Sequence, residues 1–482
     1  MNLSGRISRN SLSLISISLL ARASRWLALL VIVRFFGQEM VGQYALVITT
    51  AELFRVVSDF GIDIVVTKGL LDPKRDKSGL VGVAGRLKFF TTSFAALAAV
   101  STGLLLEFSD EVVWGIVVAS AGFYITAYTN LLRATYEAEL SVGSLVKPTI
   151  AVRLVFFLSV VLGLWAGMGV VGVIALAVAT DALLLLYVLV KAKGRGYALS
   201  SVAGTSIRGI LSSALPIGIL GIVVTAYARL STIILAKLGG EVAVAYWTSA
   251  HRIAEAALLA TGAFATSMLP VFSRYVYEMA SLQDSHKMFF PYLRKMVLLV
   301  TGCALVLALF SEQIISILFT PAYRDASPAL AVLGAWTIFA SANMFLTNML
   351  YAEDRQKTVL SISFFNLVLN ILLNLYLIPI LGFLGAAVAA VVTESVNTLL
   401  QSLAVLRGRR FLVWNRALWR FSVRVLLWIG AGALVLRVYS DGVPAIVGVV
   451  IASVYMFHLF VFRDLSPREI LAAARSVLAR RS

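Results

Sequence analysis

The stretch GVVGVIALAVATD, residues 169–181, recurs in the second half of the chain as GFLGAAVAAVVTE, residues 382–394. Both copies carry two glycines three residues apart, and both end in a threonine followed by an acid, Asp181 or Glu394. The two acids are 213 positions apart (394 − 181 = 213) in a chain of 482 residues. A shared pattern at this separation predicts that the chain consists of two structural repeats.

Each of these acids lies near the middle of an apolar stretch of roughly 20 residues, the length that a helix needs to cross a bilayer. A carboxylate at such a position costs about 2.5–3.5 kcal/mol on insertion scales, and ionisable residues there usually have a function. Many secondary transporters consist of two repeats with polar groups near mid-membrane depth. We therefore expect a membrane protein built from two such halves.

The composition agrees with a membrane environment. Hydrophobic residues make up 60% of the chain and charged residues 13%, whereas an ordinary soluble protein has about 25% charged residues. We predict an all-α polytopic membrane protein with about fourteen stretches long enough to cross the hydrocarbon core. These stretches are 11–34, 41–67, 86–106, 112–136, 148–167, 170–190, 210–236, 243–270, 295–319, 329–351, 358–378, 384–405, 421–439 and 444–462.

The basic residues are unevenly distributed between the loops. Lys and Arg number 41 against 24 acids, which gives a net charge of +17, and most of them fall on one side if both termini are cytoplasmic. This is the positive-inside pattern, so we expect the cytoplasmic (inner) membrane, both termini inside, and no nucleic-acid partner. The lone Cys303 and three scattered histidines give no metal-ligand spacing, and we expect no metal or cofactor.

Charged side chains inside the predicted spans gather on particular helix faces. At 100° per residue, four of them form a stripe about 80° wide on the second span. The members of this stripe are Glu52, Arg55, Asp59 and Asp63. Similar faces on the first and eighth spans carry Arg22 and Arg25, and Thr248, His251, Arg252 and Glu255. We therefore expect the first, second and eighth spans to line one polar cavity.

Internal salt bridges are one interpretation of these charges. Arg55 is within reach of Glu52, three residues before it, or Asp59, four residues after it, and Arg252 is within reach of Glu255. Buried ion pairs do occur without any role in ligand binding. This interpretation stays open for the second and eighth spans.

Arg22 and Arg25 are different, because the first span carries no acid with which they can pair. A guanidinium group is suited to bidentate contact with phosphate oxygens. The two arginines therefore favour an anionic, phosphate-containing ligand.

Asn366, Asn370 and Asn374 form a second polar stripe, with a spacing of four residues on the eleventh span. Asparagine can bond carbohydrate hydroxyls, and it also commonly forms hydrogen bonds between membrane helices. The sequence leaves both roles open.

Several short motifs carry a resemblance to a known family. They are Phe36-Gly37 followed by Gly42-x-Tyr44, Asp59-Phe60-Gly61 closing the second span, and Met268-Leu269-Pro270-x-x-Ser273-Arg274 closing the eighth. With the repeated Gly-x-x-Gly and its distal acid, they make nearly the whole chain resemble the polysaccharide-transport family. That family comprises the oligosaccharide flippases, Wzx-like proteins, of the multidrug/oligosaccharidyl-lipid/polysaccharide exporter superfamily.

The resemblance implies two pseudo-symmetric six-helix bundles followed by two extra helices, and the residues after these helices predict a cytoplasmic amphipathic tail. The corresponding ranges are 1–208, 209–408, 409–465 and 466–482. The family's usual acid in the seventh span is not evident, and Arg229 stands in that span instead. This difference leaves the coupling ion open.

The resemblance also implies a function, that of a flippase and not an enzyme. The cargo would be a polyprenyl-diphosphate-linked oligosaccharide, moved from the inner to the outer leaflet by alternating access and driven by an ion gradient or the membrane potential. The partners would be this lipid-linked glycan, membrane lipid and other glycan-assembly membrane proteins. O-antigen, capsule, exopolysaccharide and archaeal glycan pathways all fit.

The expected roles of the polar residues follow from this hypothesis. The diphosphate would be bound by Arg22, Arg25, Arg55 and Arg252. The glycan would contact Asn366, Asn370 and Asn374. Gating or ion coupling would fall to Asp59, Asp63, Asp181, Glu255 and Glu394.

Two other functions compete with this one. A multidrug exporter of the same superfamily would select cations through acids such as Asp59, Asp63 and Asp181. A membrane glycan polymerase or ligase would need a sizeable outer domain or loop, and every predicted external connection is short.

Overall fold

A computed structural model describes residues 23–406 apart from 73, 75, 195, 198–205 and 279–281, together with Ser13, Ile17 and Leu20. These described residues form helices and no strands, and ten of the helices are long and apolar enough to cross a membrane. The fold-class prediction of an all-α polytopic protein is confirmed. Arg22, the spans expected at 421–439 and 444–462, and the tail at 466–482 lie outside the described residues.

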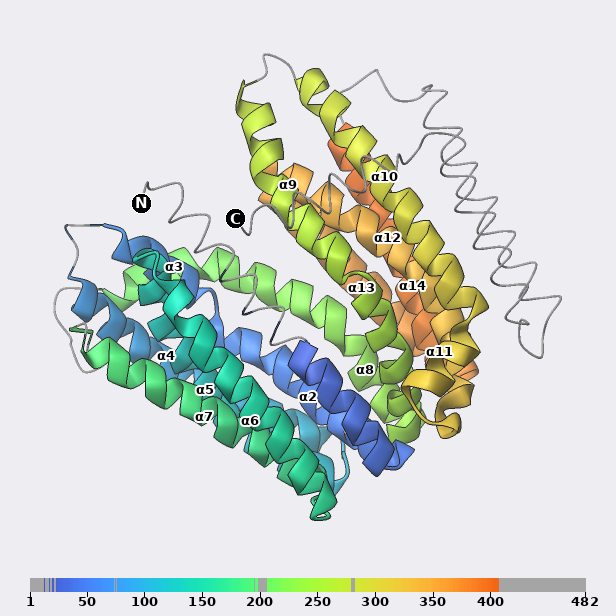
Figure 1. The fold of residues 1–482 in the computed structure, drawn as a ribbon. Coiled ribbons are helices and arrows are strands. Elements are labelled where there is room, and N and C mark those ends of the chain that lie inside the picture. Colours follow the sequence, from blue (N-terminus) through green and yellow to red (C-terminus); the bar gives the residue numbers. More distant parts are fainter. Residues whose placement is uncertain are drawn as a thin grey trace. The chain divides into compact units, whose positions relative to one another are not determined.

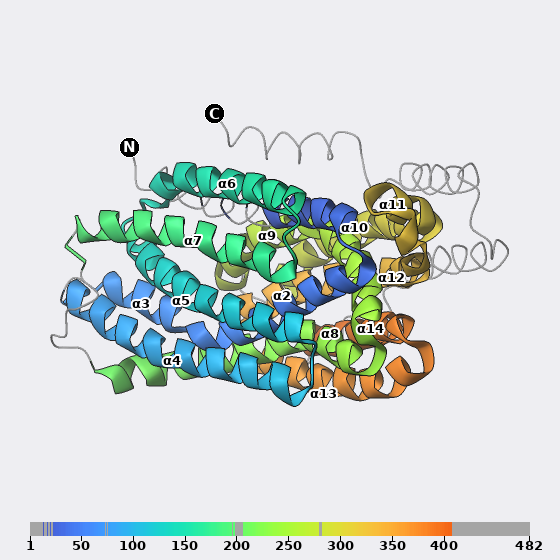
Figure 2. The same ribbon diagram turned by 90° about the horizontal axis from the view of Figure 1, so that it is seen from below.

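The chain divides into two compact units, Met1–Ala245 and Tyr246–Ser482. After the helical residues 23–35, the first unit contains α2 (Gln38–Asp59), α3 (Ile62–Leu70), α4 (Lys77–Leu105), α5 (Asp110–Ala138), α6 (Val146–Trp165), α7 (Val170–Lys193) and the first part of α8 (Ile207–Ala257). Its central helix is α5, which packs against α2, α3, α4 and α7 (Figure 1). Seen from below, α5 again lies beside α4 and α7 (Figure 2).

The second unit is built in the same way. It contains the rest of α8, α9 (Leu259–Glu278), α10 (Leu282–Leu309), α11 (Ser311–Leu318), α12 (Ser327–Ala352), α13 (Gln356–Leu381) and α14 (Phe383–Leu406). Its central helix, α12, packs against α9, α10 and α14. α5 and α12 are the fourth spans of the two predicted repeats. Each packs against the third and sixth spans of its own repeat, which are α4 and α7 for α5 and α10 and α14 for α12. This shared pattern supports the predicted repeat.

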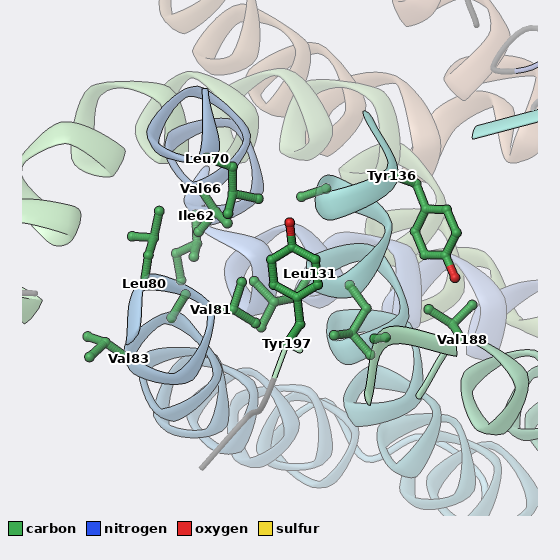
Figure 3. Packing of buried hydrophobic residues seen from close by; sticks show 14 of the residues in the cluster. Ile62, Val66, Leu70, Leu80, Val81, Val83, Leu131, Tyr136, Val188 and Tyr197 are labelled. Atoms are coloured by element: carbon green, nitrogen blue, oxygen red, sulfur yellow. The ribbon is translucent and has the colours of Figure 1, made fainter. Parts of the chain in front are cut away.

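Apolar side chains from several helices pack into one buried cluster in the first unit. Ile62 and Val66 of α3, Leu80 of α4, Leu131 of α5 and Val188 of α7 are all buried in one cluster (Figure 3). Burial of such side chains stabilises the unit by packing, because lipid tails are as apolar as the side chains themselves. Large apolar side chains on the outer faces, in contrast, are exposed as lipid contact requires.

Three predicted spans are not continuous helices in the described residues, and one of them, 243–270, is interrupted at Leu258 between α8 and α9. The span expected at 41–67 breaks between α2 and α3, where Phe60 (φ 46°) and Gly61 (φ 77°) both adopt positive φ. A Cβ atom at Gly61 would lie 2.8 Å from the side chain of Ile217, so glycine suits both the backbone and the packing here. The span expected at 295–319 likewise breaks at Phe310, between α10 and α11.

The first part of α8 lies against α2 through small residues. A Cβ atom at Gly42 would clash with the backbone oxygen of Glu241, and one at Gly218 would clash with Phe60. Close backbone approach at glycine is a common way to join membrane helices. The two compact units divide within α8, after Ala245. The domain ranges expected from the sequence stay a prediction.

The break between the seventh and eighth spans also lies in α8, at Gly240, whose φ of 77° is not helical. Nearby, the Lys237 ammonium donates a hydrogen bond of 2.9 Å to Glu107 in the connection between α4 and α5. This contact lowers the pKa of Glu107 below its ordinary value. The end of the seventh span is thereby tied to a neighbouring loop.

Candidate functional site

A group of arginines surrounds one carboxylate in the first unit. Glu52 of α2 lies 3.5 Å from the Arg25 guanidinium and 3.0 Å from that of Arg229 on α8. Arg55 follows Glu52 by three residues on α2, which places it on the same side of that helix. We call Arg25, Arg55 and Arg229 the arginine cluster.

Arg55 is the member of the cluster that differs most from expectation. The sequence allowed it to pair with Glu52 or Asp59, and neither pair forms, because Glu52 contacts Arg25 and Arg229 whereas Asp59 contacts Lys88. Within the part of the chain that the structure describes, the half-buried Arg55 side chain makes no ion pair. A cation in this position is available to an anionic ligand.

A buried lysine that the sequence did not single out holds two of the predicted acids. The Lys88 side chain on α4 is 0% exposed, and its Nζ lies 3.0 Å from Asp59 Oδ1 and 2.7 Å from Asp63 Oδ1. The same ammonium donates to the Ala127 carbonyl at 3.2 Å. We call Lys88, Asp59 and Asp63 the lysine triad. The partners are 29 and 25 residues apart (88 − 59 = 29; 88 − 63 = 25), so no local spacing indicates the contact.

The first repeated acid, Asp181 of α7, also has a basic partner. Its Oδ1 atom lies 3.0 Å from the Arg153 guanidinium on the neighbouring α6. The sequence did not identify Arg153 as a site residue. Arg153 could have been found from its position two turns inside an apolar helix, because a cation at such a position needs an anionic partner.

The second repeated acid, Glu394 of α14, is held by an amide instead. Asn343 Nδ2 on α12 donates to the Glu394 side chain at 2.7 Å and to its backbone oxygen at 3.2 Å, and all three groups are buried. The two acids therefore occupy repeated positions in the sequence but differ in environment. Their shared gating role stays a prediction.

Charged residues of the eighth span also pair with each other. Arg252 donates to Glu255 at 3.0 Å, as the spacing of three residues allowed. His251 lies 3.7 Å from the same carboxylate, and its ring stacks between Trp247 and Trp336, with centroids 4.8 and 5.1 Å away. The local pairing predicted for this span is thus observed.

The asparagine stripe lies between helices. Asn366, Asn370 and Asn374 of α13 are at most 3% exposed. Asn366 donates to Asn397 at 3.1 Å and Asn370 donates to Thr393 at 3.3 Å, both on α14. These hydrogen bonds join α13 to α14, which is one of the two roles that the sequence left open for the asparagines. A glycan would reach these amides only if α13 and α14 separated, so contact with the glycan stays a prediction.

The structure gathers part of the predicted site within one unit. Arg25 and Arg55 belong to the first unit, where Arg229 joins them, and Arg252 belongs to the second. Among the described residues, no group of three or more His, Cys, Asp or Glu side chains is arranged to hold a metal ion. The arrangement that remains is a set of guanidinium groups inside membrane-spanning helices.

Two units of helices that are long and apolar enough to cross a membrane define the class of protein as a polytopic helical membrane protein. A family model described as "Polysaccharide biosynthesis protein" matches residues 7–276, and one described as "Lipid II flippase MurJ" matches residues 145–474. Each match covers more than half of the chain. The chain therefore belongs to the polysaccharide-transport family, within the multidrug/oligosaccharidyl-lipid/polysaccharide exporter superfamily.

Two curated relatives match shorter segments. An uncharacterised membrane protein of Methanocaldococcus jannaschii is 34% identical over 95 residues, which are 20% of this chain and 19% of that protein. The probable low-salt glycan biosynthesis flippase Agl15 of Haloferax volcanii is 26% identical over 159 residues, which are 33% of this chain and 34% of that protein. The matched segments thus span about a fifth and about a third of these relatives.

Solved structures share the fold over most of the chain. The lipid II flippase MurJ in an inward closed conformation superposes with a TM-score of 0.73 at 14% identity, over 93% of this chain and 99% of MurJ. An inward-facing multidrug transporter of the MATE family gives a TM-score of 0.66 at 15% identity, over 82% of this chain and 98% of that one. At these identities the similarity concerns the fold alone, and it confirms the predicted architecture.

Proposed function

We propose that this protein is a flippase that moves a polyprenyl-diphosphate-linked oligosaccharide from the inner to the outer leaflet of the cytoplasmic membrane. The observation that carries the proposal is the arginine cluster, in which the Arg25 and Arg229 guanidinium groups contact Glu52 and Arg55 follows one turn later on the same helix. Cations at this depth are costly unless an anion compensates them. A diphosphate supplies such an anion and offers oxygens for bidentate contact.

The family to which this chain belongs supports a lipid-linked glycan as the cargo. Proteins that match the same family model or share a segment with this chain are named as flippases for lipid II or for a glycan. A lipid with a diphosphate and a glycan headgroup would require the chain to shield polar groups while the polyprenyl tail stays in lipid. Alternating exposure of the cluster to either side would provide this shielding.

The membrane potential can contribute to the driving force. With a negative interior, each uncompensated negative charge that moves outward gains about 2.3 kcal/mol per 100 mV. The diphosphate would therefore move in its electrically favourable direction. Both termini would lie in the cytoplasm, on the side that holds most of the basic loops.

The cation exporter is less well supported, because the acids that it would use already have basic partners. Asp59 and Asp63 contact Lys88, and Asp181 contacts Arg153. An organic cation would have to displace a lysine or an arginine at each place. This competition disfavours selection of cations by these acids.

Deletion of the gene in its host tests the proposal. Lipid-linked oligosaccharides would be quantified by mass spectrometry together with the glycan at the cell surface. We expect the lipid-linked units to accumulate, to resist a glycosidase added from outside, and to be accompanied by loss of surface glycan. Accumulation of units that the glycosidase cleaves would point to a polymerase or ligase, and unchanged glycan and precursor would contradict the proposal.

A further inference from the structure

The lysine triad joins three helices of the first unit. Asp59 is the last residue of α2, Asp63 lies in the first turn of α3, and Lys88 belongs to α4. We propose that this triad binds one proton, and that its protonation couples proton movement to the transport proposed above. The coupling, but not the proton site itself, rests on that proposed function.

The charges of the triad leave room for one proton. Asp59 Oδ1 and Asp63 Oδ1 lie 3.0 and 2.7 Å from the same ammonium nitrogen, and the lysine side chain is 0% exposed. One buried cation therefore faces two carboxylates, and the group carries a net negative charge when both are ionised. Two carboxylates that converge in this way favour a state in which they share one proton. The protonated triad is electrically neutral, as a site surrounded by apolar helices requires.

The position of the ammonium favours a proton over a metal ion. Lys88 lies between the two carboxylates and also donates to the Ala127 carbonyl, so a metal would have to displace it. Sodium or calcium would further need several oxygen ligands around one point. Asp63 Oδ1 is buried and receives no well-aligned hydrogen bond, although the ammonium lies close to it. A proton can occupy this carboxyl group without other ligands.

Among the residues that the structure describes, no further acid contacts the triad. On α2, Arg55 precedes Asp59 by one turn. From α5, the Tyr128 hydroxyl donates to the Gly85 carbonyl at 3.1 Å, and the Tyr124 hydroxyl bonds Ser93 at 2.8 Å. From α8, the residues against the Phe60–Gly61 break are Ala214, Ile217 and Gly218, none of which ionises. Among these neighbours, the two aspartates are the groups that titrate as carboxyls.

The triad also spans a break in the chain, which gives protonation a structural consequence. Asp59 and Asp63 stand on either side of Phe60 and Gly61, both of which have positive φ, and Lys88 holds the two sides together. Protonation of one carboxyl weakens one of these two ionic contacts. The same α2 helix carries Arg55, so proton binding and anion binding act on one segment. Two ligands that bias the same conformational equilibrium are thermodynamically coupled.

Infrared difference spectroscopy of the full chain in lipid nanodiscs tests the proton site without any glycan substrate. As the pH rises, we expect the wild-type protein to lose the C=O band of one buried protonated carboxyl group. Asp59→Asn and Asp63→Asn should each abolish this band, because the remaining aspartate then forms a neutral one-to-one pair with Lys88. Asp181→Asn is the matched control and should leave the band in place, since Asp181 already pairs with Arg153.

A flipping measurement in liposomes then tests the coupling. An imposed pH gradient should accelerate flipping by the wild-type protein, and Asp63→Asn should lose this acceleration. Absence of the carboxyl band, or its survival in both single variants, would overturn the proton site and leave the proposed flippase untouched. A band without any response of flipping to the gradient would overturn the coupling. A normal band with no flipping under any condition would instead overturn the proposed function, and the coupling with it.

Discussion

The ion pairs of Glu52 could not be predicted from the spacing of charged residues along its own helix. Its nearest basic residue in sequence is Arg55, yet its guanidinium contacts come from Arg25 and from Arg229 on α8. Side chains on neighbouring helices compete with those on the same helix, because helices in membranes approach closely at small residues. Arg55 is left without an ion pair in the described structure, and it therefore gives the most informative variant.

Arg55→Ala should weaken binding of a polyprenyl diphosphate and leave the fold intact. No described ion pair is lost, so the melting temperature should stay close to that of the wild type. A hydrogen bond to a charged group contributes about 1.5–3 kcal/mol, which corresponds to a loss in affinity of about 10- to 150-fold. Native mass spectrometry with the diphosphate lipid measures the affinity.

Arg133→Ala is the matched control for this variant. Arg133 is an arginine of the same unit, paired with Glu137 at 3.0 Å on α5, and it lies outside the arginine cluster. Its removal should leave diphosphate affinity unchanged. Equal affinities for the wild type, Arg55→Ala and Arg133→Ala would remove Arg55 from the binding site.

Lys88→Met should destabilise the first unit. The substitution leaves Asp59 and Asp63 without their shared cation, and breaking a buried ion pair by removing one partner costs about 3–5 kcal/mol. Thermal unfolding in detergent should show a lower transition temperature. The triple variant Lys88→Met, Asp59→Asn, Asp63→Asn should recover much of the loss, because it removes the buried charges. Wild-type stability of Lys88→Met alone would show that the triad does not hold these helices together.

At the level of residues, the sequence predicted several of the charged side chains in the membrane-crossing helices, but it missed Lys88 and Arg153. The pair of Arg252 and Glu255 lies on one helix, and its spacing was sufficient to predict it. The partners Lys88 and Arg153 belong to other helices than the acids that they hold. Such contacts depend on which helix faces meet, and a single sequence gives no direct signal for that.

At the level of elements, the apolar pattern predicted where the helices lie in the sequence. It did not predict where they are interrupted. The motif Asp59-Phe60-Gly61 lies in a stretch apolar enough to read as one span, yet α2 ends at Asp59 and α3 begins at Ile62. Hydropathy indicates how many residues can lie in lipid, but it does not detect a helix break caused by two residues of positive φ. The glycine was the local signal for this break.

The contact between α2 and α8 gives a prediction at the same scale. A Cβ atom at Gly42 would clash with the Glu241 backbone, and Glu241 also accepts hydrogen bonds from Gln43 at 2.8 Å and Ser109 at 2.5 Å. Gly42→Ala should therefore force the two helices apart and destabilise the unit by about 1–3 kcal/mol, the usual range for overpacking. A lower melting temperature in detergent would show this effect.

Gly37→Ala is the control for that variant. Gly37 has no atom within 4 Å of the position of an added Cβ and a φ of −66°, so alanine fits there without strain. The two substitutions add the same methyl group five residues apart (42 − 37 = 5). Equal melting temperatures for both variants would contradict close packing of α2 on α8.

At the scale of the molecule, the two units share a packing pattern and differ in their polar groups. Asp181 pairs with an arginine, whereas Glu394 at the repeated position accepts from Asn343. The arginine cluster and the lysine triad belong to the first unit, and the asparagine stripe belongs to the second. The sequence repeat therefore predicted the architecture of the molecule better than its chemistry, since each copy has acquired its own polar partners.

The central claim is that the arginine cluster carries a diphosphate-linked glycan across the membrane, and a reconstituted flipping assay tests it most directly. The full chain would be placed in liposomes that contain a polyprenyl-diphosphate oligosaccharide in both leaflets, and a glycosidase would be added outside. We predict that the wild type and Arg133→Ala expose the inner pool to cleavage, whereas a variant with both Arg55→Ala and Arg229→Ala leaves that pool protected. Flipping by the double variant at the wild-type rate, or full protection of the inner pool with the wild type, would contradict the account.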